Sequence, residues 1–345
     1  MEEAGMNNNV IIMDCERINE KTDLSKFEGK DILITGATGL IGTYLLYSVY
    51  VFNRTSSDPI KVTIVSNRPL PDHLADISVE SWLSVLHGDL SDVDFLHSLG
   101  MYDAIIHAAG YGQPGKFLEN KLKTLTLNTS CTQYLLSRVR HGGHFLFVST
   151  SEVYSGSEDI PYTEKTHGVT MPDHPRACYI EGKRCGEAFC NVYAGKGDFK
   201  VNIARVALAY GPGVRPDDQR VLYSFIRKAL GGSIEMLDAG TAQRVYCYVS
   251  DTVENLWNIM LKGKEVTYNV GGISHTSIFE LADSIAKILH TTVKISQDND
   301  SKMNGAPQNV DMDISKVNGE LGKTDYVPLE NGLQRTIEWY RQYFA

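Results

Sequence analysis

The chain has 345 residues, of which 42% are hydrophobic and 22% charged, and this composition predicts a globular protein of one large or two moderate domains. A formal net charge of -9, without any run of lysines and arginines, excludes a nucleic-acid-binding surface. The six cysteines show neither a CxxC motif nor metal-type spacing, which predicts reduced thiols, a cytoplasmic protein and no metal site.

The first 29 residues are mostly charged or polar and contain one short apolar stretch, residues 10–13. This stretch is too short for a membrane span or a signal peptide, so we expect no membrane association. We interpret residues 1–29 as a lead-in segment without an assigned role.

Residues 31–35 form an apolar run that ends in a glycine-rich sequence, and the apolar spacing after it is typical of a helix. A strand, a glycine-rich turn and a helix in this order predict a dinucleotide site, because glycines let backbone amides approach a pyrophosphate at the helix N-terminus. The spacing is GxxGxxG rather than GxGxxG. The cofactor-binding residues predicted in this turn are Gly36, Thr38, Gly39, Leu40, Ile41 and Gly42.

The second predicted strand, residues 61–66, lacks a final carboxylate that would bind the ribose 2′-hydroxyl of NAD. Ser66, Asn67 and Arg68 stand there instead. Asn67 can reach a ribose hydroxyl, whereas Arg68 can either pair with a 2′-phosphate or lie in a solvated turn. The choice between NAD and NADP stays open.

The third and fourth predicted strands are residues 84–87 and 104–107. Asp89, after the third, either accepts a hydrogen bond from the adenine amine or caps a helix that starts at Ser91. Small residues after the fourth allow a dinucleotide to lie close to the backbone. The predicted cofactor-binding residues here are Asp89, Leu90, Ala108 and Ala109.

Residues 111–115 are rich in glycine and proline and predict a loop at the edge of the sheet where such folds bind ligands. Tyr111 and Gln113 of this loop are candidate substrate-binding residues. The next predicted helix, residues 118–140, carries Asn128, which either hydrogen-bonds to the active-site strand or is an exposed helix residue.

The fifth predicted strand, residues 144–148, leads into a cluster of hydroxyls and a carboxylate. Thr150 and Ser151 can hydrogen-bond a substrate hydroxyl. Glu152 adds a second acid/base group, which the simple oxidation of an alcohol does not require.

Tyr179 and Lys183 are four residues apart on a predicted helix, so they project to the same side. A cation beside a tyrosine lowers its pKa from the ordinary value of about 10. We therefore expect Tyr179 to accept a proton from a sugar or alcohol hydroxyl near neutral pH.

A sixth buried strand is predicted at residues 201–206, and the sequence changes character after residue 211. Arg220 and Arg244 are candidates for binding a diphosphate, because the fork of an arginine matches its oxygens. Ser250 or Asp251 is expected to cap a helix that runs to residue 260. We also predict helices at residues 220–230 and 329–344, and a helix that starts at Thr276 or Ser277 and runs to Leu289. Short strands are predicted at 233–237, 246–249, 268–270 and 293–295, and a polar loop that can cover the nucleotide at 297–310.

With Gly36-x-x-Gly39-x-x-Gly42, Thr150 and Tyr179-x-x-x-Lys183 in this order, the chain resembles the extended short-chain dehydrogenase/reductase family, and within it the UDP-glucuronate decarboxylases among the nucleotide-sugar enzymes. The similar stretches include residues 121–128, 149–154, 175–184, 203–212 and 244–251. The resemblance implies an α/β fold with a Rossmann-type doubly wound parallel sheet. It assigns residues 30–210 to a dinucleotide-binding domain with the catalytic residues, and residues 211–345 to a smaller C-terminal α/β lobe that mainly binds the nucleotide sugar.

In that family, bound NAD removes hydride from sugar C4, the tyrosine takes the hydroxyl proton, the 4-keto acid loses CO2 and the hydride returns. The resemblance implies that Thr150 and Ser151 hold the substrate hydroxyls and that Glu152 transfers protons at C5. It also implies that Arg244 lies close to the sugar and diphosphate. It makes Tyr179, Lys183 and Asn128 part of the cofactor site as well. It also implies a homodimer formed through the helices that contain Asn128 and Tyr179.

Three positions depart from the decarboxylase pattern. The loop at residues 110–115 replaces one that is rich in Ser and Pro and helps to hold the sugar carboxylate, so Tyr111 and Gln113 would serve that group here. Leu208 replaces an Asn that touches the substrate, and Ser66 replaces an Asp. The alternatives are a nucleotide-sugar 4-epimerase or 4,6-dehydratase, a net NAD(P)-dependent oxidoreductase, and a non-catalytic dinucleotide-sensing protein.

Overall fold

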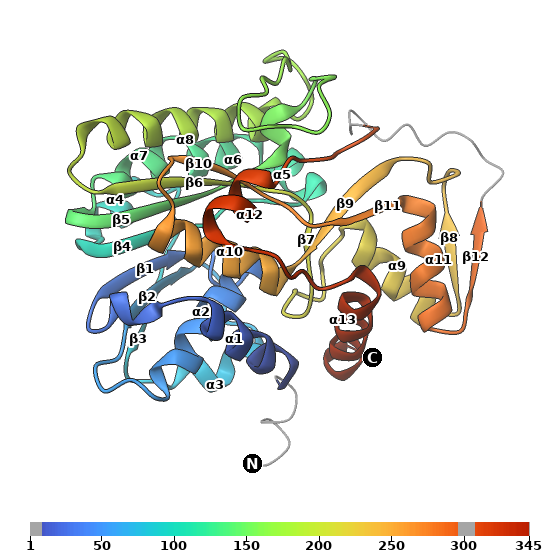
Figure 1. Cartoon of the computed structure of the whole chain (residues 1–345), viewed down its shortest axis with the longest axis horizontal. Helices are drawn as coiled ribbons and strands as arrows, with labels where there is room; N and C mark the ends of the chain where they lie inside the picture. The colour runs from blue at the N-terminus through green and yellow to red at the C-terminus, as the bar shows by residue number, and fades with distance from the viewer. Residues whose placement is uncertain (1–8, 296–307, 345) are drawn as a thin grey trace.

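The computed structural model describes residues 9–295 and 308–344, and its centre is a seven-stranded parallel sheet in the order β10-β6-β5-β4-β1-β2-β3 (Figure 1). β1 pairs with β2 on one side and with β4 on the other, so the strand order reverses between β1 and β4. This confirms the predicted doubly wound α/β fold, in which ligands bind at the carboxyl ends of the strands at the reversal. The strands are β1 Asp31–Thr35, β2 Lys61–Ser66, β3 Leu83–His87, β4 Tyr102–His107, β5 Val139–Thr150, β6 Lys200–Val206 and β10 Thr267–Val270.

Both faces of the sheet are buried, which explains why its strands are almost continuously apolar. Ile32 and Ile34 of β1 pack into one hydrophobic core, and Leu33 between them packs into another. The first core is covered by α1 (Asn9–Lys21), α2 (Leu40–Asn53) and α10 (Val249–Lys262), and the second by α4 (Val93–Ser98), α6 (Lys121–Asn128), α7 (Ser130–Leu136) and α8 (Ala177–Lys196) (Figure 1). The short elements η2 (Asp72–Leu74) and α3 (Ala75–Ser78) connect β2 to β3.

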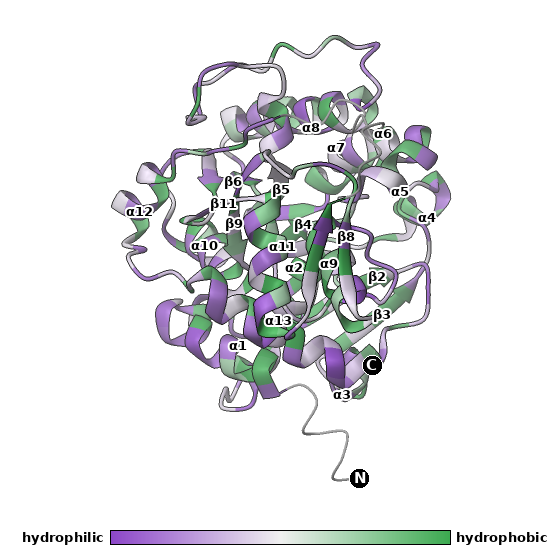
Figure 2. Ribbon diagram, turned by 90° about the vertical axis from the view of Figure 1, so that its right-hand side faces the viewer, coloured by the Kyte–Doolittle hydropathy of each residue, from purple (hydrophilic) through white to green (hydrophobic). Residues whose placement is uncertain are grey.

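The second half of the chain adds a smaller lobe beside the main sheet (Figures 1 and 2). Two small sheets form it, one with β9 between β7 and β11 and one with β8 paired to β12. Ser277, one of the two residues at which the sequence predicted this helix to start, makes a reciprocal capping box with Glu280 at the start of α11. The elements are β7 Ala209–Tyr210, α9 Val221–Leu230, β8 Ser233–Met236, β9 Gln243–Tyr248, β11 Ser274–Ser277, α11 Ile278–Ile288, β12 Thr292–Ile295, α12 Ser315–Leu321 and α13 Leu329–Phe344.

The N-terminal segment, to which the sequence assigned no structure, forms α1 and the 3-10 helix η1 (Leu24–Phe27) and packs into the main core. The buried carboxylate of Asp14 accepts hydrogen bonds from the hydroxyls of Tyr44 at 3.0 Å and Tyr248 at 2.7 Å. Its other oxygen forms an ion pair with Arg335 of α13 at 2.7 Å. Asp14 therefore joins α1, α2, the small lobe and α13.

Three local predictions were wrong. The helix expected at residues 118–140 is three helices, α5 (Pro114–Glu119), α6 and α7, because the backbone leaves the helical conformation at Asn120 and Thr129, and β5 begins at Val139. The N-cap of α10 is Tyr248 rather than Ser250 or Asp251. The helix after β3 is capped by Asp92, whose side chain accepts from the amides of Asp94 and Phe95, rather than by Asp89.

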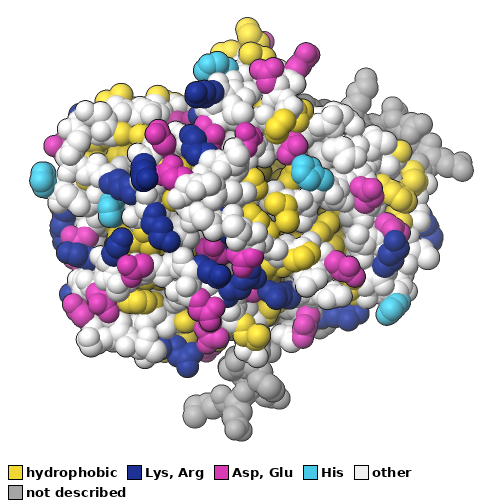
Figure 3. Space-filling model, in the orientation of Figure 1, with side chains coloured by type: hydrophobic (Ala, Val, Ile, Leu, Met, Phe, Trp, Pro, Cys, Tyr) yellow, Lys and Arg dark blue, Asp and Glu magenta, His cyan; other side chains and the backbone are white. Residues whose placement is uncertain are grey.

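The face shown in Figure 3 carries interspersed acidic and basic side chains, with hydrophobic side chains between the main body and the small lobe. Among the residues that the structure describes, no helix is long and apolar enough to cross a membrane. Most of the loop predicted at residues 297–310 lies outside the described residues; the part that is described adjoins β9, where the amide of Val310 donates to the carbonyl of Gln243.

Candidate active site

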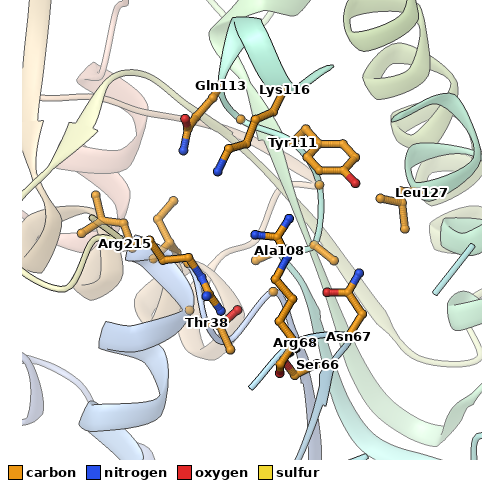
Figure 4. Close-up of a pocket in the computed structure, with 18 of the residues that line it drawn as sticks. Thr38, Ser66, Asn67, Arg68, Ala108, Tyr111, Gln113, Lys116, Leu127 and Arg215 are labelled. Atoms are coloured by element: carbon orange, nitrogen blue, oxygen red, sulfur yellow. Dashed lines mark hydrogen bonds between the residues drawn. The ribbon is translucent and has the colours of Figure 1, made fainter. Parts of the chain in front are cut away.

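A cavity of about 340 Å³ opens at the carboxyl ends of the strands where their order reverses (Figure 4). It brings together most of the predicted cofactor residues and three of the predicted substrate residues. These are Gly36, Thr38, Gly39, Leu40, Ile41, Gly42, Asn67, Arg68, Asp89, Leu90, Ala108 and Ala109, with Tyr111, Gln113 and Arg220. Its wall also includes Lys116, Lys123, Arg215 and Asp218, which the sequence analysis did not name.

Two glycines keep the floor of this cavity free of side chains. A Cβ on Gly36, whose φ is +73°, would lie 2.5 Å from the carbonyl oxygen of Ala108. A Cβ on Gly42 would lie 2.2 Å from the carbonyl oxygen of Gly36, whereas Gly39 meets no atom closer than 3.4 Å. The turn leads directly into the N-terminus of α2, so this bare backbone fits the pyrophosphate of a dinucleotide.

The carboxyl end of β2 offers hydroxyl, amide and guanidinium groups to the cavity (Figure 4). The hydroxyl of Ser66 donates to the carbonyl of Arg68 at 2.7 Å and so fixes the turn after the strand. Asn67 and Arg68 are exposed, and the side chains of Arg68 and Arg215 both point into the cavity (Figure 4). Arg215 was missed because nothing in its local sequence shows that residues 211–219 fold back over the cavity.

Asp89 is held by an ion pair with Lys123. Burial raises the pKa of its carboxyl group, but hydrogen bonds from Lys123 and Ser91 outweigh burial and leave the pKa below the ordinary value. Asp89 is therefore an ionised hydrogen-bond acceptor at this edge of the cavity, as an adenine amine would need.

Tyr179 does not line this cavity; it is buried beside Thr150, and its ring stacks on that of Phe117 with 4.8 Å between the ring centres. Tyr111, which lines the cavity, packs against the same cluster. Burial, followed by the carboxylate of Glu152, raises the pKa of Tyr179 to about 12, although a hydrogen bond with Thr150 opposes the rise. The expectation that Lys183 lowers this pKa was wrong for this state of the protein, because burial dominates.

Lys183 is buried one turn further along α8 and donates to the carbonyl of Val148 at 2.7 Å. Burial lowers the pKa of its ammonium group to about 8, and the carboxylate of Glu187 opposes the fall. Tyr179, Lys183 and Glu187 are spaced by four residues and occupy one face of α8. They meet Thr150, Val148 and Ser149 of β5, respectively.

Glu152 is clamped by Arg176, whose Nε lies 3.0 Å from one carboxylate oxygen and whose Nη2 contacts the other. The guanidinium of Arg176 is buried and lies 5.2 Å from the centre of the Phe117 ring, on whose surface it packs. Sequence reasoning missed Arg176 and Phe117 as site residues. The only local signal was the position of Arg176 three residues before Tyr179, which places it at the N-cap of α8.

A second buried ion pair lies next to Lys183, between α8 and β6. Glu187 pairs with Arg205 of β6 at 2.6 Å and accepts a hydrogen bond from Ser149 at 2.6 Å. Ser149 and Arg205 are partners in the β5–β6 register, so one carboxylate joins two strands and α8. Arg205 also donates to the hydroxyl of Tyr154 at 2.9 Å.

The remaining predicted site residues contact mainly protein groups. Asn128 is buried but donates to Thr124 of its own helix at 2.8 Å, so the expected bond to the active-site strand is not made. Arg220 lines the cavity and is paired with Asp218 at 2.7 Å. Arg244 is buried and donates to the carbonyls of Gln243 and Gln308, at 2.7 and 3.0 Å. Ser151 begins the 3-10 helix η3 (Ser151–Tyr154) and is partly exposed.

The model of the NAD dependent epimerase/dehydratase family matches residues 32–271. A UDP-glucuronic acid decarboxylase 1 of Xenopus tropicalis is 33% identical over 322 residues, covering 92% of this chain and 74% of that protein. The structure of MoeE5 in complex with UDP-glucuronic acid and NAD is similar, with a TM-score of 0.74 and 25% identity over 90% of this chain and 99% of the other. A UDP-glucuronic acid 4-epimerase from Bacillus cereus shares the fold, with a TM-score of 0.77 and 23% identity over 91% of this chain and 100% of the other.

Proposed function

The chain belongs to the NAD-dependent epimerase/dehydratase family, and on this basis we propose that it oxidises C4 of UDP-glucuronate transiently with bound NAD and then decarboxylates the sugar. One observation carries the proposal: Thr150, Tyr179 and Lys183 meet on a buried wall that adjoins a glycine-floored cavity suited to a dinucleotide. The identity to a decarboxylase over 92% of the chain supports the choice of substrate.

In the proposed C4 oxidation, each residue on this wall has a separate role. Tyr179 accepts the proton of the C4 hydroxyl, and Thr150, which already hydrogen-bonds Tyr179, holds that hydroxyl in place. Lys183 holds a positive charge on the same face of α8. NAD, when bound, supplies the hydride acceptor and a further positive charge. The resulting C4 ketone is β to the sugar carboxylate, so the electrons released with CO2 settle as an enolate.

After CO2 leaves, C5 must receive a proton. Glu152 is the acid/base group on this wall, but Arg176 engages both of its carboxylate oxygens. We infer that this pair opens when the sugar binds, so that Arg176 can meet the sugar carboxylate and Glu152 can serve C5.

A second candidate function follows from the same pair. If Glu152 and Arg176 stay together, C4 oxidation and hydride return still proceed, but no protein group handles protons at C5. The outcome is then 4-epimerisation of UDP-glucuronate to UDP-galacturonate, which moves no proton at C5. Leu208 and the loop at residues 110–115, where the chain departs from the decarboxylase pattern, also favour this alternative.

Several wider proposals accompany this function. We assign the dinucleotide to residues 30–210 and mainly the nucleotide sugar to residues 211–345. The exposed apolar side chains of Leu122 on α6 and Val192 on α8, 78% and 62% exposed, support a homodimer through these helices, which light scattering during size-exclusion chromatography tests. Six free cysteines support a cytoplasmic location.

The experiment is incubation of the protein with UDP-glucuronate and NAD in D2O, followed by NMR and mass spectrometry. Decarboxylation gives CO2 and a UDP-pentose with deuterium at C5, whereas 4-epimerisation gives UDP-galacturonate without CO2. Accumulation of NADH in proportion to product would instead indicate a net oxidoreductase. If dinucleotide-loaded protein leaves the sugar unchanged, UDP-glucuronate is the wrong substrate, and neutral UDP-, GDP-, dTDP- and CDP-hexoses are tested next for epimerisation and 4,6-dehydration.

Glu152→Gln separates the two leading functions. It removes the proton donor for C5, so it should stop decarboxylation and leave 4-epimerisation intact. Tyr179→Phe is the matched control, since it should stop both reactions.

A further inference from the structure

Two segments that are far apart in the sequence meet at the rim of the cavity. One is the start of α5 and the other is residues 214–219 after β7, and residues of both line the cavity (Figure 4). The ammonium of Lys116 forms an ion pair with Asp217 at 2.7 Å. The amide of Gln219 donates to the side-chain oxygen of Gln113 at 3.1 Å. We call these two contacts the bridge.

Each of the two segments is anchored to a different part of the protein. In α5, the ring of Phe117 is buried and stacks on that of Tyr179, which belongs to the main body. In the segment after β7, the carbonyl of Asp218 accepts a hydrogen bond at 2.6 Å from Arg227 of α9, which belongs to the small lobe. The bridge therefore joins the main body to the small lobe beside the cavity.

The bridge has the properties of a contact that opens. The side chains of Lys116 and Asp217 are 26% and 51% exposed, and an ion pair so accessible to water is weak. Gly112 and Gly115 stand on either side of Gln113. A Cβ at either glycine would meet no atom within 4 Å, and neither has a positive φ, so sterics do not require glycine there. What these glycines supply is backbone freedom next to the bridge.

The proposed reaction gives such a contact a purpose. Because the hydride returns to the sugar, the dinucleotide ends each cycle as NAD and has no need to leave. We propose that the bridge is a latch that retains the dinucleotide, which leaves only after Lys116 and Gln113 separate from the segment after β7. The latch rests on the proposed function in this one respect, since a net oxidoreductase must exchange its dinucleotide at every turnover.

The opposite charges of Lys116 and Asp217 distinguish a latch from simple electrostatics. Asp217 also acts on the cavity itself, because it lies near Arg68, and it raises the pKa of Arg215 against burial and the charge of Arg68. Without a latch, loss of the Asp217 charge makes the cavity more positive and slows the release of an anionic dinucleotide, whereas loss of the Lys116 charge speeds release. With a latch, both losses speed release.

The test is the rate at which NADH leaves the full chain when excess NAD displaces it, followed by stopped-flow fluorescence after copurified dinucleotide is removed. Lys116→Met and Asp217→Asn should each speed release about two- to fivefold, the range expected for an exposed ion pair. The double variant should be no faster than the faster single variant, because both changes remove the same contact. Gln113→Leu, which changes no charge, should speed release about threefold.

The matched controls are Lys287→Met and Asp283→Asn. They make the same charge changes in an ion pair of the same length, 2.7 Å, on α11. Neither residue lines the cavity, so neither variant should change the rate of NADH release.

Two results would overturn the latch. One is that Lys116→Met and Asp217→Asn change release in opposite directions and their effects multiply in the double variant. The other is that release is unchanged in Gln113→Leu and in the double variant. The measurement needs no sugar, so a protein that shows the latch but leaves UDP-glucuronate unchanged loses only the proposed function. Turnover of UDP-glucuronate by a protein whose NADH release ignores all these variants means the reverse.

Discussion

Replacing Glu187 with Gln tests whether the buried ion pair between Glu187 and Arg205 serves both stability and the proposed chemistry. Glu187 is buried, pairs with Arg205 at 2.6 Å and accepts from Ser149 at 2.6 Å. Removing one charge of a buried pair costs about 3–5 kcal/mol, since the other charge is left without compensation. Arg205 keeps its contacts with Tyr154 and with the carbonyl of Glu164, so we expect the lower end, about 3 kcal/mol.

The same substitution should change the pH dependence of turnover. The carboxylate of Glu187 raises the pKa of Lys183, which burial holds at about 8. Without that carboxylate the pKa falls further, so Lys183 loses its proton at a lower pH. The alkaline limb of the pH–rate profile should therefore move toward acid in Glu187→Gln, which a purely structural defect would not produce.

The assays are urea unfolding and a pH–rate profile, with Glu181→Gln as the matched control on the same helix. Glu181 pairs with Arg184 near the surface, so its loss should cost less than about 1 kcal/mol. The double variant Glu187→Gln with Arg205→Gln should regain part of the lost stability, because no unpaired charge then stays buried. Unchanged stability and an unchanged profile in Glu187→Gln would refute the reasoning.

Three further predictions concern the site and the core. Tyr179→Phe should lower turnover by at least about a hundredfold while the dinucleotide stays bound, as measured by kinetics and calorimetry, and near-normal turnover would remove Tyr179 from its assigned role. Gly36→Ala should abolish dinucleotide binding, since its Cβ would lie 2.5 Å from a carbonyl oxygen, and Gly39→Ala, with 3.4 Å of room, should retain it. Burial lowers the pKa of His107 to about 3 and of His73 to about 4, so the unfolded chain binds protons first as the pH falls. Above pH 6.5 these histidines are mainly neutral in both the folded and the unfolded chain, so their burial costs little stability. By pH 5 the unfolded chain has bound protons that the folded chain has not, so each histidine should lower the free energy of unfolding by about 2 kcal/mol. Urea midpoints that stay constant from pH 7 to 5 would contradict this.

Elements whose stability is local were the ones that the sequence predicted well. The apolar run at residues 31–35 and its glycine turn have the predicted bounds, and α13 begins and ends at the predicted residues. By contrast, α1 is polar over most of its surface, and its buried Asp14 meets Tyr44, Tyr248 and Arg335, which no local pattern reveals.

In the site, too, local sequence predicted the features that depend on neighbouring residues and missed those that depend on distant ones. Spacing alone placed Tyr179 and Lys183 on one helix face, but the pKa of Tyr179 depends on burial and on Glu152, which spacing does not report. Neither Arg176 nor Arg215 was named as a site residue from the sequence. Only the folded backbone brings Arg176 to Glu152 and Arg215 to the cavity.

The ion pair between Asp14 and Arg335 also bears on how the chain folds during synthesis. The two residues are 321 positions apart, so α1 leaves the ribosome long before α13 exists. Until then Asp14 lacks its counter-charge, and moving that carboxylate out of water is unfavourable. Docking of α1 in its final form thus waits for the last helix, and a nascent chain cut short before α13 would leave the apolar side of α1 loosely held and open to chaperones or proteases.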